Sequence, residues 1–367
     1  MTDTSPVAPL AQAESPVAPL AQAESPVAPL AQALVIGANG YLGSHVVRQL
    51  VADGQDVRVM VREGANTIGI DDLDVQRFIG DIWDDDALTA AMTGVDVIYY
   101  CVVDTRGWLR DPAPLFHTNV DGTRHVLDIA VRPEIASGLK KFVFTSSYAT
   151  VGRRRGQVST EEDIADERKL TPYVRSRVQA EKLVLQYARE RGLPAVAMCV
   201  STTYGGTDWG RTPHGAIIAG AAFGKLPFVM SGIELEAVGV NDAARALILA
   251  AEKGRVGERY LISEKMISNA EVARIAAEAA GVPAPTRSIP LPLTYLLAAM
   301  GTIKGRLRRT DERLSLASLR LMRAEAPVDH GKAARELGWQ PAPVEDSIRE
   351  AARFWVGLRA AKRQKAG

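Results

Sequence analysis

The feature that most constrains the fold is an alternation, beginning after Ala33, of short apolar runs with longer amphipathic segments. Nearly every position of the short runs is apolar, as in strands that are covered on both faces. Strands alternating with helices join through right-handed crossovers into a parallel sheet. The pattern therefore predicts an α/β fold, a doubly wound parallel sheet with about seven strands. We expect the strands at 34–37, 56–61, 75–80, 95–103, 141–146, 194–200 and, returning late to the sheet, 260–263.

Composition and charge argue against several classes of protein. The 367 residues carry a net charge of +1, so no overall attraction to nucleic acid is expected. Cys101 and Cys199 both lie in apolar runs, and the five histidines show no metal-ligand spacing. Neither a disulfide framework nor a metal site is therefore expected, and a cytoplasmic protein fits best.

Two further segments carry predictions of their own. The sequence SPVAPLAQAE occurs at 5–14 and again at 15–24, and its prolines oppose helix formation, so we expect a disordered tail over 1–33. This tail lacks the basic start and unbroken apolar core of a signal peptide. The late apolar run 290–301 is too short to span a bilayer and predicts a buried helix. Interfacial membrane contact, helped by the basic residues of 304–309, is the alternative.

A glycine-rich turn, GANGYLG, follows the first expected strand. Gly37, Gly40 and Gly43 stand at intervals of three residues. Glycines allow a tight turn and a close approach of the backbone to a pyrophosphate, whose charge then lies at a helix N-terminus. Between a strand and a helix, this turn predicts a dinucleotide-binding unit. The alternative is that the glycines serve only helix–strand packing.

The ends of the second and third expected strands bear on the choice of cofactor. An acidic residue at the second strand end would bind ribose hydroxyls, but this chain has Arg62 there. The planar guanidinium suits a 2′-phosphate, which favours NADP over NAD, although the neighbouring Glu63 works against this. Asp81, after the third strand, either accepts a hydrogen bond from the adenine amino group or is a solvated loop residue.

The stretch TPYVRSRVQAEK at 171–182 carries the candidate chemistry. Its first residues are typical of a helix start, which places Tyr173 and Arg177 one turn apart on one face. A phenol titrates near pH ~10, and a cation one turn away stabilises its phenolate, so the pair suits proton transfer. Ser146 and Ser147 end the fifth strand, at the sheet edge where ligands bind.

Taken together, these motifs resemble a known family. GANGYLG, VRVMVRE, GDIWD, NVDGT, FVFTSS and YVRSR follow the order and spacing of the extended short-chain dehydrogenase/reductase superfamily, over about residues 34–357. The chain is most similar to its dihydroflavonol-reductase-like and 3β-hydroxysteroid-dehydrogenase-like branches. The resemblance implies a Rossmann-type sheet and a catalytic Ser, Tyr and Lys. Ser147 would polarise a carbonyl, Tyr173 would donate the proton, and Arg177 stands in the position of the lysine.

Further site residues follow from the same resemblance. Asn119 in NVDGT matches a residue that orders the active-site helix and its water, or else it is a buried polar residue that satisfies backbone groups. The complete predicted cofactor site comprises Gly37, Asn39, Gly40, Tyr41, Leu42, Gly43, Arg62, Asp81, Ile82, Tyr173 and Arg177.

The chain departs from the family pattern at two places. Arg177 keeps the charge of the lysine, but its head is wider and more rigid. Cys199 and Val200 stand where the family usually has Arg-Pro, before the turn that follows the sixth strand. The loop that helps to seat the nicotinamide is therefore expected to be remodelled.

The predicted organisation has two parts. A dinucleotide-binding domain spans 34–200, with 238–263 returning to it, and a smaller substrate lobe comprises 201–237 and 264–367. The lobe is rich in aliphatic residues, which favours an apolar small-molecule substrate over a sugar diphosphate.

The leading prediction is an NADP-dependent oxidoreductase that interconverts a ketone and a secondary alcohol, with NAD as the alternative cofactor. A nucleotide-sugar epimerase or dehydratase is the second candidate. A non-catalytic dinucleotide-binding protein, in which Arg177 marks lost chemistry, is the third. No integral membrane span and no nucleic-acid partner is expected, and a homodimer is compatible with the sequence.

Overall fold

The computed structural model describes residues 32–152, 157–322 and 327–364. The predicted tail over 1–33 lies outside the described residues except for its last two positions, and Ala33 already belongs to the first strand.

The central sheet accounts for seven parallel strands of the described chain, in the order β10-β6-β5-β4-β1-β2-β3. Their bounds are β1 (Ala33–Ile36), β2 (Val57–Val61), β3 (Gln76–Ile79), β4 (Val97–Tyr100), β5 (Lys141–Ser147), β6 (Ala195–Val200) and β10 (Arg259–Ile262). The late strand β10 returns to this sheet, as predicted, and it pairs with β6. This arrangement confirms the doubly wound sheet. The order reverses between β1 and β4, and ligands of such sheets bind at that point.

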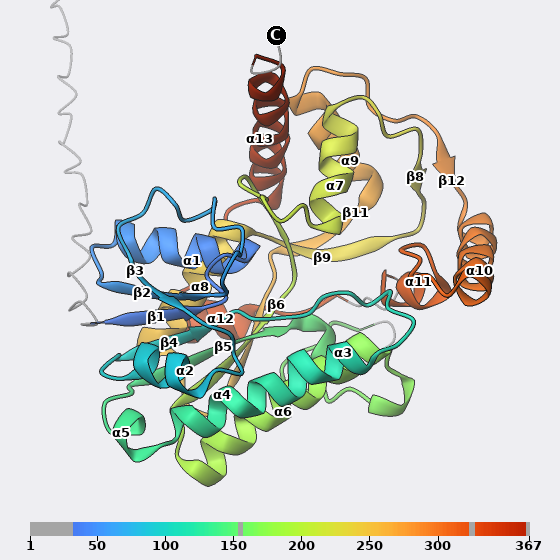
Figure 1. Cartoon of the computed structure of the whole chain (residues 1–367). Coiled ribbons are helices and arrows are strands. Elements are labelled where there is room, and N and C mark those ends of the chain that lie inside the picture. Colours follow the sequence, from blue (N-terminus) through green and yellow to red (C-terminus); the bar gives the residue numbers. More distant parts are fainter. Residues whose placement is uncertain (1–31, 153–156, 323–326, 365–367) are drawn as a thin grey trace, which may run out of the picture.

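Alternate side chains along each strand supply a core on either face of the sheet. Val35 and Val59 face one group of helices, α1 (Tyr41–Ala52), α8 (Val240–Lys253) and α12 (Gly331–Leu337). Leu34 and Phe142 face the other group, α2 (Asp85–Met92), α4 (Gly122–Ala130) and α6 (Pro172–Arg191). Figure 1 shows α1 and α8 above the sheet and α4 and α6 below it. The apolar character of the strands therefore reflects burial on both sides.

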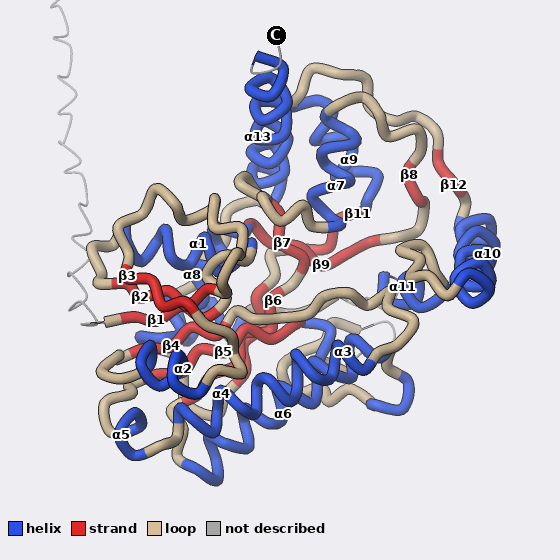
Figure 2. The backbone as a smooth tube through the Cα atoms, viewed as in Figure 1, coloured by secondary structure: helices blue, strands red, loops and turns tan. Residues whose placement is uncertain are grey.

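The remaining elements gather to one side of the central sheet, in the upper right of Figure 1. Strands β7 (Thr202–Tyr204), β9 (Glu234–Gly239) and β11 (Lys265–Ser268) form a small sheet, packed against α7 (Pro213–Ala222), α9 (Asn269–Ala279) and α13 (Val344–Gln364). Strands β8 (Val229–Met230) and β12 (Ser288–Ile289) pair and lead to α10 (Leu291–Arg308) and α11 (Leu316–Met322). Figure 2 shows these short strands apart from the main sheet. The short helices α3 (Ala113–Phe116) and α5 (Pro133–Ala136) complete the α-helices of the described chain.

The apolar run 290–301 forms most of α10, but the prediction that this helix is buried is wrong for one of its faces. Leu296, Met300 and Leu307 are all more than half exposed. The reason is that apolar residues occupy both faces of α10, whereas α11 and β9 cover only one. Among the described residues, no helix has the length and hydrophobicity needed to cross a bilayer.

Candidate functional site

The glycine-rich turn between β1 and α1 is shaped to hold a ligand backbone. Gly37 has a φ of +85°, and a Cβ at this residue would lie 3.0 Å from the backbone of Cys101. A Cβ at Gly43 would lie 2.3 Å from the Gly37 carbonyl oxygen, so α1 can start this close only with glycine. No side chain caps α1, whose first residue is Tyr41. The free N–H groups of this first turn and the open glycine surface fit a dinucleotide pyrophosphate.

The other predicted residues of this turn differ in exposure. Asn39 and Gly40 are exposed, whereas Tyr41 and Leu42 are half-buried. The hydroxyl of Tyr41 lies 3.3 Å from the position that a Cβ of Gly205 would occupy. Burial raises the pKa of Tyr41 well above its ordinary value. Tyr41 and Leu42 therefore offer a ligand mainly their backbone groups.

Three predicted cofactor residues follow the neighbouring strands β2 and β3. Arg62 comes directly after β2, and its side chain is exposed. Asp81 lies two residues beyond β3, and its carboxylate accepts a hydrogen bond from the backbone of Trp83 at 3.3 Å. Ile82 is buried against Gly122. Because β2 and β3 are parallel neighbours, Arg62 and Asp81 lie at the same edge of the sheet.

Tyr173 meets Ser147 where α6 passes the carboxyl end of β5. Thr171 caps α6 by accepting a hydrogen bond from the Val174 backbone, and this start places Tyr173 in the first turn. Burial raises the pKa of Tyr173; the charge of Arg177 and a hydrogen bond with Ser147 lower it in part, and the net shift is upward. The expected stabilisation of phenolate by Arg177 is thus present but smaller than the effect of burial. At neutral pH Tyr173 is a protonated phenol, the form that donates a proton.

Arg177 is enclosed by its neighbours, with only 1% of its surface exposed. Its Nη2 donates to the backbone carbonyl of Thr145, and the guanidinium lies over the ring of Phe144, 5.1 Å from the ring centroid. Its Nε and Nη1 have no hydrogen-bond partner among the described residues. These two nitrogens are the donors that Arg177 would have available for a cofactor ribose.

Asn119 lies in a π-helical turn, His117–Asp121, between α3 and α4. It is fully buried and exchanges two hydrogen bonds with the backbone of Asp104, at 2.8 and 3.0 Å. Its Nδ2 also donates to the hydroxyl of Ser176 on α6 at 3.0 Å. Asn119 thus satisfies the backbone of the loop after β4 and joins that loop to the helix that carries Tyr173. π-Helical turns inside helices occur frequently at functional sites.

Sequence reasoning missed a buried carboxylate, Glu181, one turn beyond Arg177. It is 3% exposed and forms an ion pair with Arg259 at 3.2 Å. The same carboxylate accepts hydrogen bonds from Ser146, Thr150 and Cys199. The spacing of Tyr173, Arg177 and Glu181 at every fourth residue places all three on one helix face, which is the signal that could have revealed the carboxylate.

Arg259 brings a guanidinium to Glu181 beside Cys199. Cys199 occupies the position where the family usually has arginine, and it is fully buried on β6. Arg259 starts the neighbouring strand β10 and also donates to the Thr150 hydroxyl at 3.2 Å. Thr150 belongs to the turn that follows Ser147. The chain therefore has an arginine in this region, but Arg259 of β10 supplies it and not the residue at position 199 of β6.

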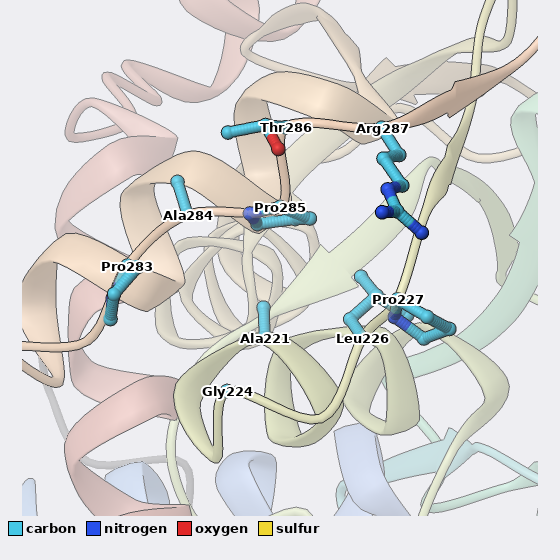
Figure 3. Close-up of a pocket in the computed structure, with 9 residues that line it drawn as sticks. All are labelled: Ala221, Gly224, Leu226, Pro227, Pro283, Ala284, Pro285, Thr286 and Arg287. Atoms are coloured by element: carbon cyan, nitrogen blue, oxygen red, sulfur yellow. The ribbon is translucent and has the colours of Figure 1, made fainter.

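A hollow of about 300 Å³ opens elsewhere, between the end of α7 and the segment 283–287, as Figure 3 shows. Its walls are formed by Ala221, Gly224, Leu226, Pro227, Pro283, Ala284, Pro285, Thr286 and Arg287. None of the predicted site residues belongs to these walls. Arg287 is the one charged side chain among them, and the hollow shows no grouping of catalytic side chains.

Comparisons with known proteins identify the family. The pattern of the NAD dependent epimerase/dehydratase family matches residues 33–263. The chain is 27% identical over 336 residues to a putative dihydroflavonol 4-reductase of Synechocystis sp., covering 88% of this chain and 93% of the relative. It is 29% identical over 324 residues to sterol demethylase protein B of Methylococcus capsulatus, covering 87% and 96%.

Solved structures agree with this result. The crystal structure of gox2253 superposes with a TM-score of 0.77 at 30% sequence identity, covering 89% of this chain and 98% of that one. The chain therefore belongs to the NAD-dependent epimerase/dehydratase family of extended short-chain dehydrogenases/reductases, which are NAD(P)-dependent oxidoreductases.

Proposed function

We propose that the chain is an NADP-dependent oxidoreductase that interconverts a ketone and a secondary alcohol on a fairly apolar small molecule. The observation that carries this proposal is the proximity of the Tyr173 phenol to the Ser147 hydroxyl at the carboxyl end of β5, where Ser147 helps to lower the pKa of the phenol. It places a phenol and a hydroxyl side by side at the sheet edge where ligands bind.

The chain's own residues would handle the carbonyl oxygen and the proton, while the bound cofactor supplies or accepts a hydride. In the direction of reduction, the Ser147 hydroxyl donates a hydrogen bond to the carbonyl oxygen and orients it toward Tyr173. The Tyr173 hydroxyl then transfers its proton to that oxygen as the alcohol forms. General acid catalysis of this kind typically contributes about 10²–10⁴-fold. The raised pKa of Tyr173 keeps the phenol protonated at neutral pH, so the acid that reduction requires is present.

NADP rather than NAD is supported by Arg62. The side chain is exposed at the end of β2, where the adenosine ribose of a dinucleotide held by the glycine turn would lie. A guanidinium at that place can bind a 2′-phosphate through two parallel hydrogen bonds. Glu63 is exposed beside it and opposes the phosphate by its charge.

A ketone substrate is supported by the name of the Synechocystis relative, a putative dihydroflavonol 4-reductase. The substrate lobe that we propose, 201–237 and 264–367, is rich in aliphatic residues, which supports an apolar substrate. An epimerase or dehydratase acting on a nucleotide sugar is the alternative that the family description favours.

The test uses purified full-length protein with NADPH and a panel of apolar ketones, followed through NADPH absorbance. Oxidation of NADPH that depends on a ketone and disappears in Tyr173→Phe supports the proposal. Conversion of a UDP- or dTDP-linked sugar with no net consumption of NADPH would replace it with the epimerase or dehydratase alternative. Cofactor binding without turnover on either panel, in the wild type and in Arg177→Lys, would show a non-catalytic binding protein.

A further inference from the structure

Helix α10 carries an exposed apolar stripe that runs along its length. The stripe consists of five large side chains, each between 44% and 79% exposed: Leu293, Leu296, Met300, Ile303 and Leu307. Their spacing alternates between three and four residues, which places them on one face of the helix. Figure 1 shows α10 at the outer edge of the molecule, beyond α11. The stripe therefore faces outward on an accessible rim.

The opposite face of α10 fixes its orientation. Ala298 is fully buried in a cluster with Leu235 and Leu319. A Cβ at Gly301 would lie 2.0 Å from the Leu314 carbonyl oxygen, so the following segment packs directly on the helix backbone. Thr302 accepts a hydrogen bond from the Leu316 backbone at 3.0 Å. These contacts hold α10 by its small residues. The helix would lose the contacts if it rotated to turn its large apolar side chains inward.

The charged residues near the C-terminal end of α10 indicate which kind of partner could cover this stripe. Residues 291–308 contain no acidic side chain, and Arg306, Arg308 and the following Arg309 are exposed at one end of the helix. Lys304 pairs with Glu312 at 2.8 Å, so one cation there is already compensated. Over 304–313 there are five basic and two acidic residues. The end of the stripe is therefore locally positive, although the chain as a whole is nearly neutral.

A second copy of α10 offers no acidic group to meet these arginines, because the copy has the same sequence. An anionic bilayer surface matches both features: its acyl region accepts the apolar side chains and its headgroups attract the arginines. The stripe spans the fifteen residues 293–307, or about 21 Å of helix between its ends, which is shorter than the hydrocarbon core of a bilayer. The geometry thus suits a helix that lies in the plane of the interface.

We propose that α10 is a membrane-docking helix that binds anionic phospholipid surfaces through its apolar stripe and its C-terminal arginines. It lies flat, with Met300, Ile303 and Leu307 among the headgroups and acyl ends, and with Arg306 and Arg309 against the lipid phosphates. This inference is independent of the reaction proposed above, because it uses none of the residues of the candidate site.

The test is co-sedimentation of the full chain with vesicles of phosphatidylcholine alone and with vesicles containing roughly one third phosphatidylglycerol. We expect binding to the anionic vesicles, weak binding to the neutral ones, and weakening by added salt. Ile303→Ser/Leu307→Ser should reduce anionic binding by at least about tenfold. Arg306→Gln/Arg308→Gln/Arg309→Gln should bring binding to the level seen with neutral vesicles.

A matched control replaces two aliphatic residues of similar exposure far from α10 in the sequence. Ile79 and Ile164 are 57% and 78% exposed, against 57% and 79% for Ile303 and Leu307. Ile79→Ser/Ile164→Ser should bind vesicles like the wild type, and circular dichroism checks that every variant is folded. The proposal is overturned if the wild-type protein does not co-sediment with anionic vesicles. Binding of anionic vesicles by the α10 variants at the wild-type level also overturns it. A concentration-dependent dimer that is lost only in Ile303→Ser/Leu307→Ser would overturn it as well, because the apolar stripe would then join two copies of the chain.

Discussion

The guanidinium of Arg177 donates a hydrogen bond to the backbone carbonyl of Thr145, two residues before Ser147 on β5. This contact joins α6, which carries Tyr173, to the strand that carries Ser147. The arginine therefore acts on the candidate site in two ways. Its charge lowers the pKa of Tyr173 in part, and its hydrogen bond ties the helix of Tyr173 to the strand of Ser147.

Replacement of Arg177 by lysine separates these two effects. We expect Arg177→Lys to raise kcat several-fold, because a compact ammonium on a flexible stem can approach the Tyr173 oxygen more closely than the enclosed guanidinium. The measurement is kcat with NADPH and the best ketone of the panel. Arg189→Lys, on the exposed end of the same helix, is the control and should change nothing. A slower Arg177→Lys enzyme would mean that the site has been rebuilt around arginine.

Tyr173→Phe should lower kcat by about 10²–10⁴-fold, since it removes the proton donor and leaves the ring in place. Thermal melting should show the variant still folded. The matched control is Tyr187→Phe on the same helix, where the hydroxyl bonds to Asp128 at 2.5 Å, away from the candidate site. Comparable losses of activity in both variants would indicate that helix stability, rather than proton transfer, had been perturbed.

The pH dependence follows from the raised pKa of Tyr173. Reduction needs the protonated phenol, so kcat/KM for the ketone should stay level through neutral pH and fall only in alkaline solution. Oxidation of the alcohol needs phenolate and should rise with pH over the same range. In Arg177→Met both changes should move to higher pH, because a cation that lowers the pKa has been removed. A decline in reduction already at neutral pH would contradict the assignment of Tyr173.

Arg62→Ala should weaken NADPH binding by roughly 1.5–3 kcal/mol, which corresponds to about 10–150-fold in Kd, the range for hydrogen bonds to charged groups. NADH lacks the 2′-phosphate, so its affinity should hardly change. Glu63→Gln removes a like charge and should tighten NADPH binding. Fluorescence titration of NADPH and NADH into the wild type, Arg62→Ala and Glu63→Gln gives the six Kd values needed. Equal losses for NADPH and NADH in Arg62→Ala would assign the arginine a structural role.

Arg259→Met should destabilise the fold by about 3–5 kcal/mol, because it leaves the buried carboxylate of Glu181 without its cation. Urea denaturation measures the change, and Arg259→Met/Glu181→Gln should recover part of it. Arg255→Met breaks an ion pair with Glu336 at the surface and is expected to have little effect. Equal losses of unfolding free energy in Arg259→Met and Arg255→Met would show that the buried ion pair contributes no more to stability than the surface pair.

Much of this arrangement could be predicted because it depends on local patterns. The strands are unbroken apolar runs, and the meeting of Tyr173 with Ser147 follows from a helix spacing and a strand end. The return of β10 to the sheet was predicted, but its pairing with β6 and the contact of Arg259 with Glu181 were not, since both join residues far apart in the sequence. An outward apolar face of α10 was only the alternative to a buried helix, because hydrophobicity does not say which face a neighbour covers. The pKa of Tyr173 could not be predicted either, because it depends mainly on burial and a sequence motif does not show how deeply a side chain is buried.

The ion pair between Arg259 and Glu181 has a consequence for how this site can evolve. The carboxylate, itself buried, contacts the buried thiol of Cys199 on one strand and the guanidinium of Arg259, whose side chain is 16% exposed, on the next. This site holds one cation against one anion, so an arginine at position 199 and another at 259 exclude each other. Relatives that keep the family arginine at the position of Cys199 should therefore carry a neutral residue opposite it. We therefore expect the two positions to covary among relatives, with a cation at one of them, a neutral residue at the other and the carboxylate kept at the position of Glu181.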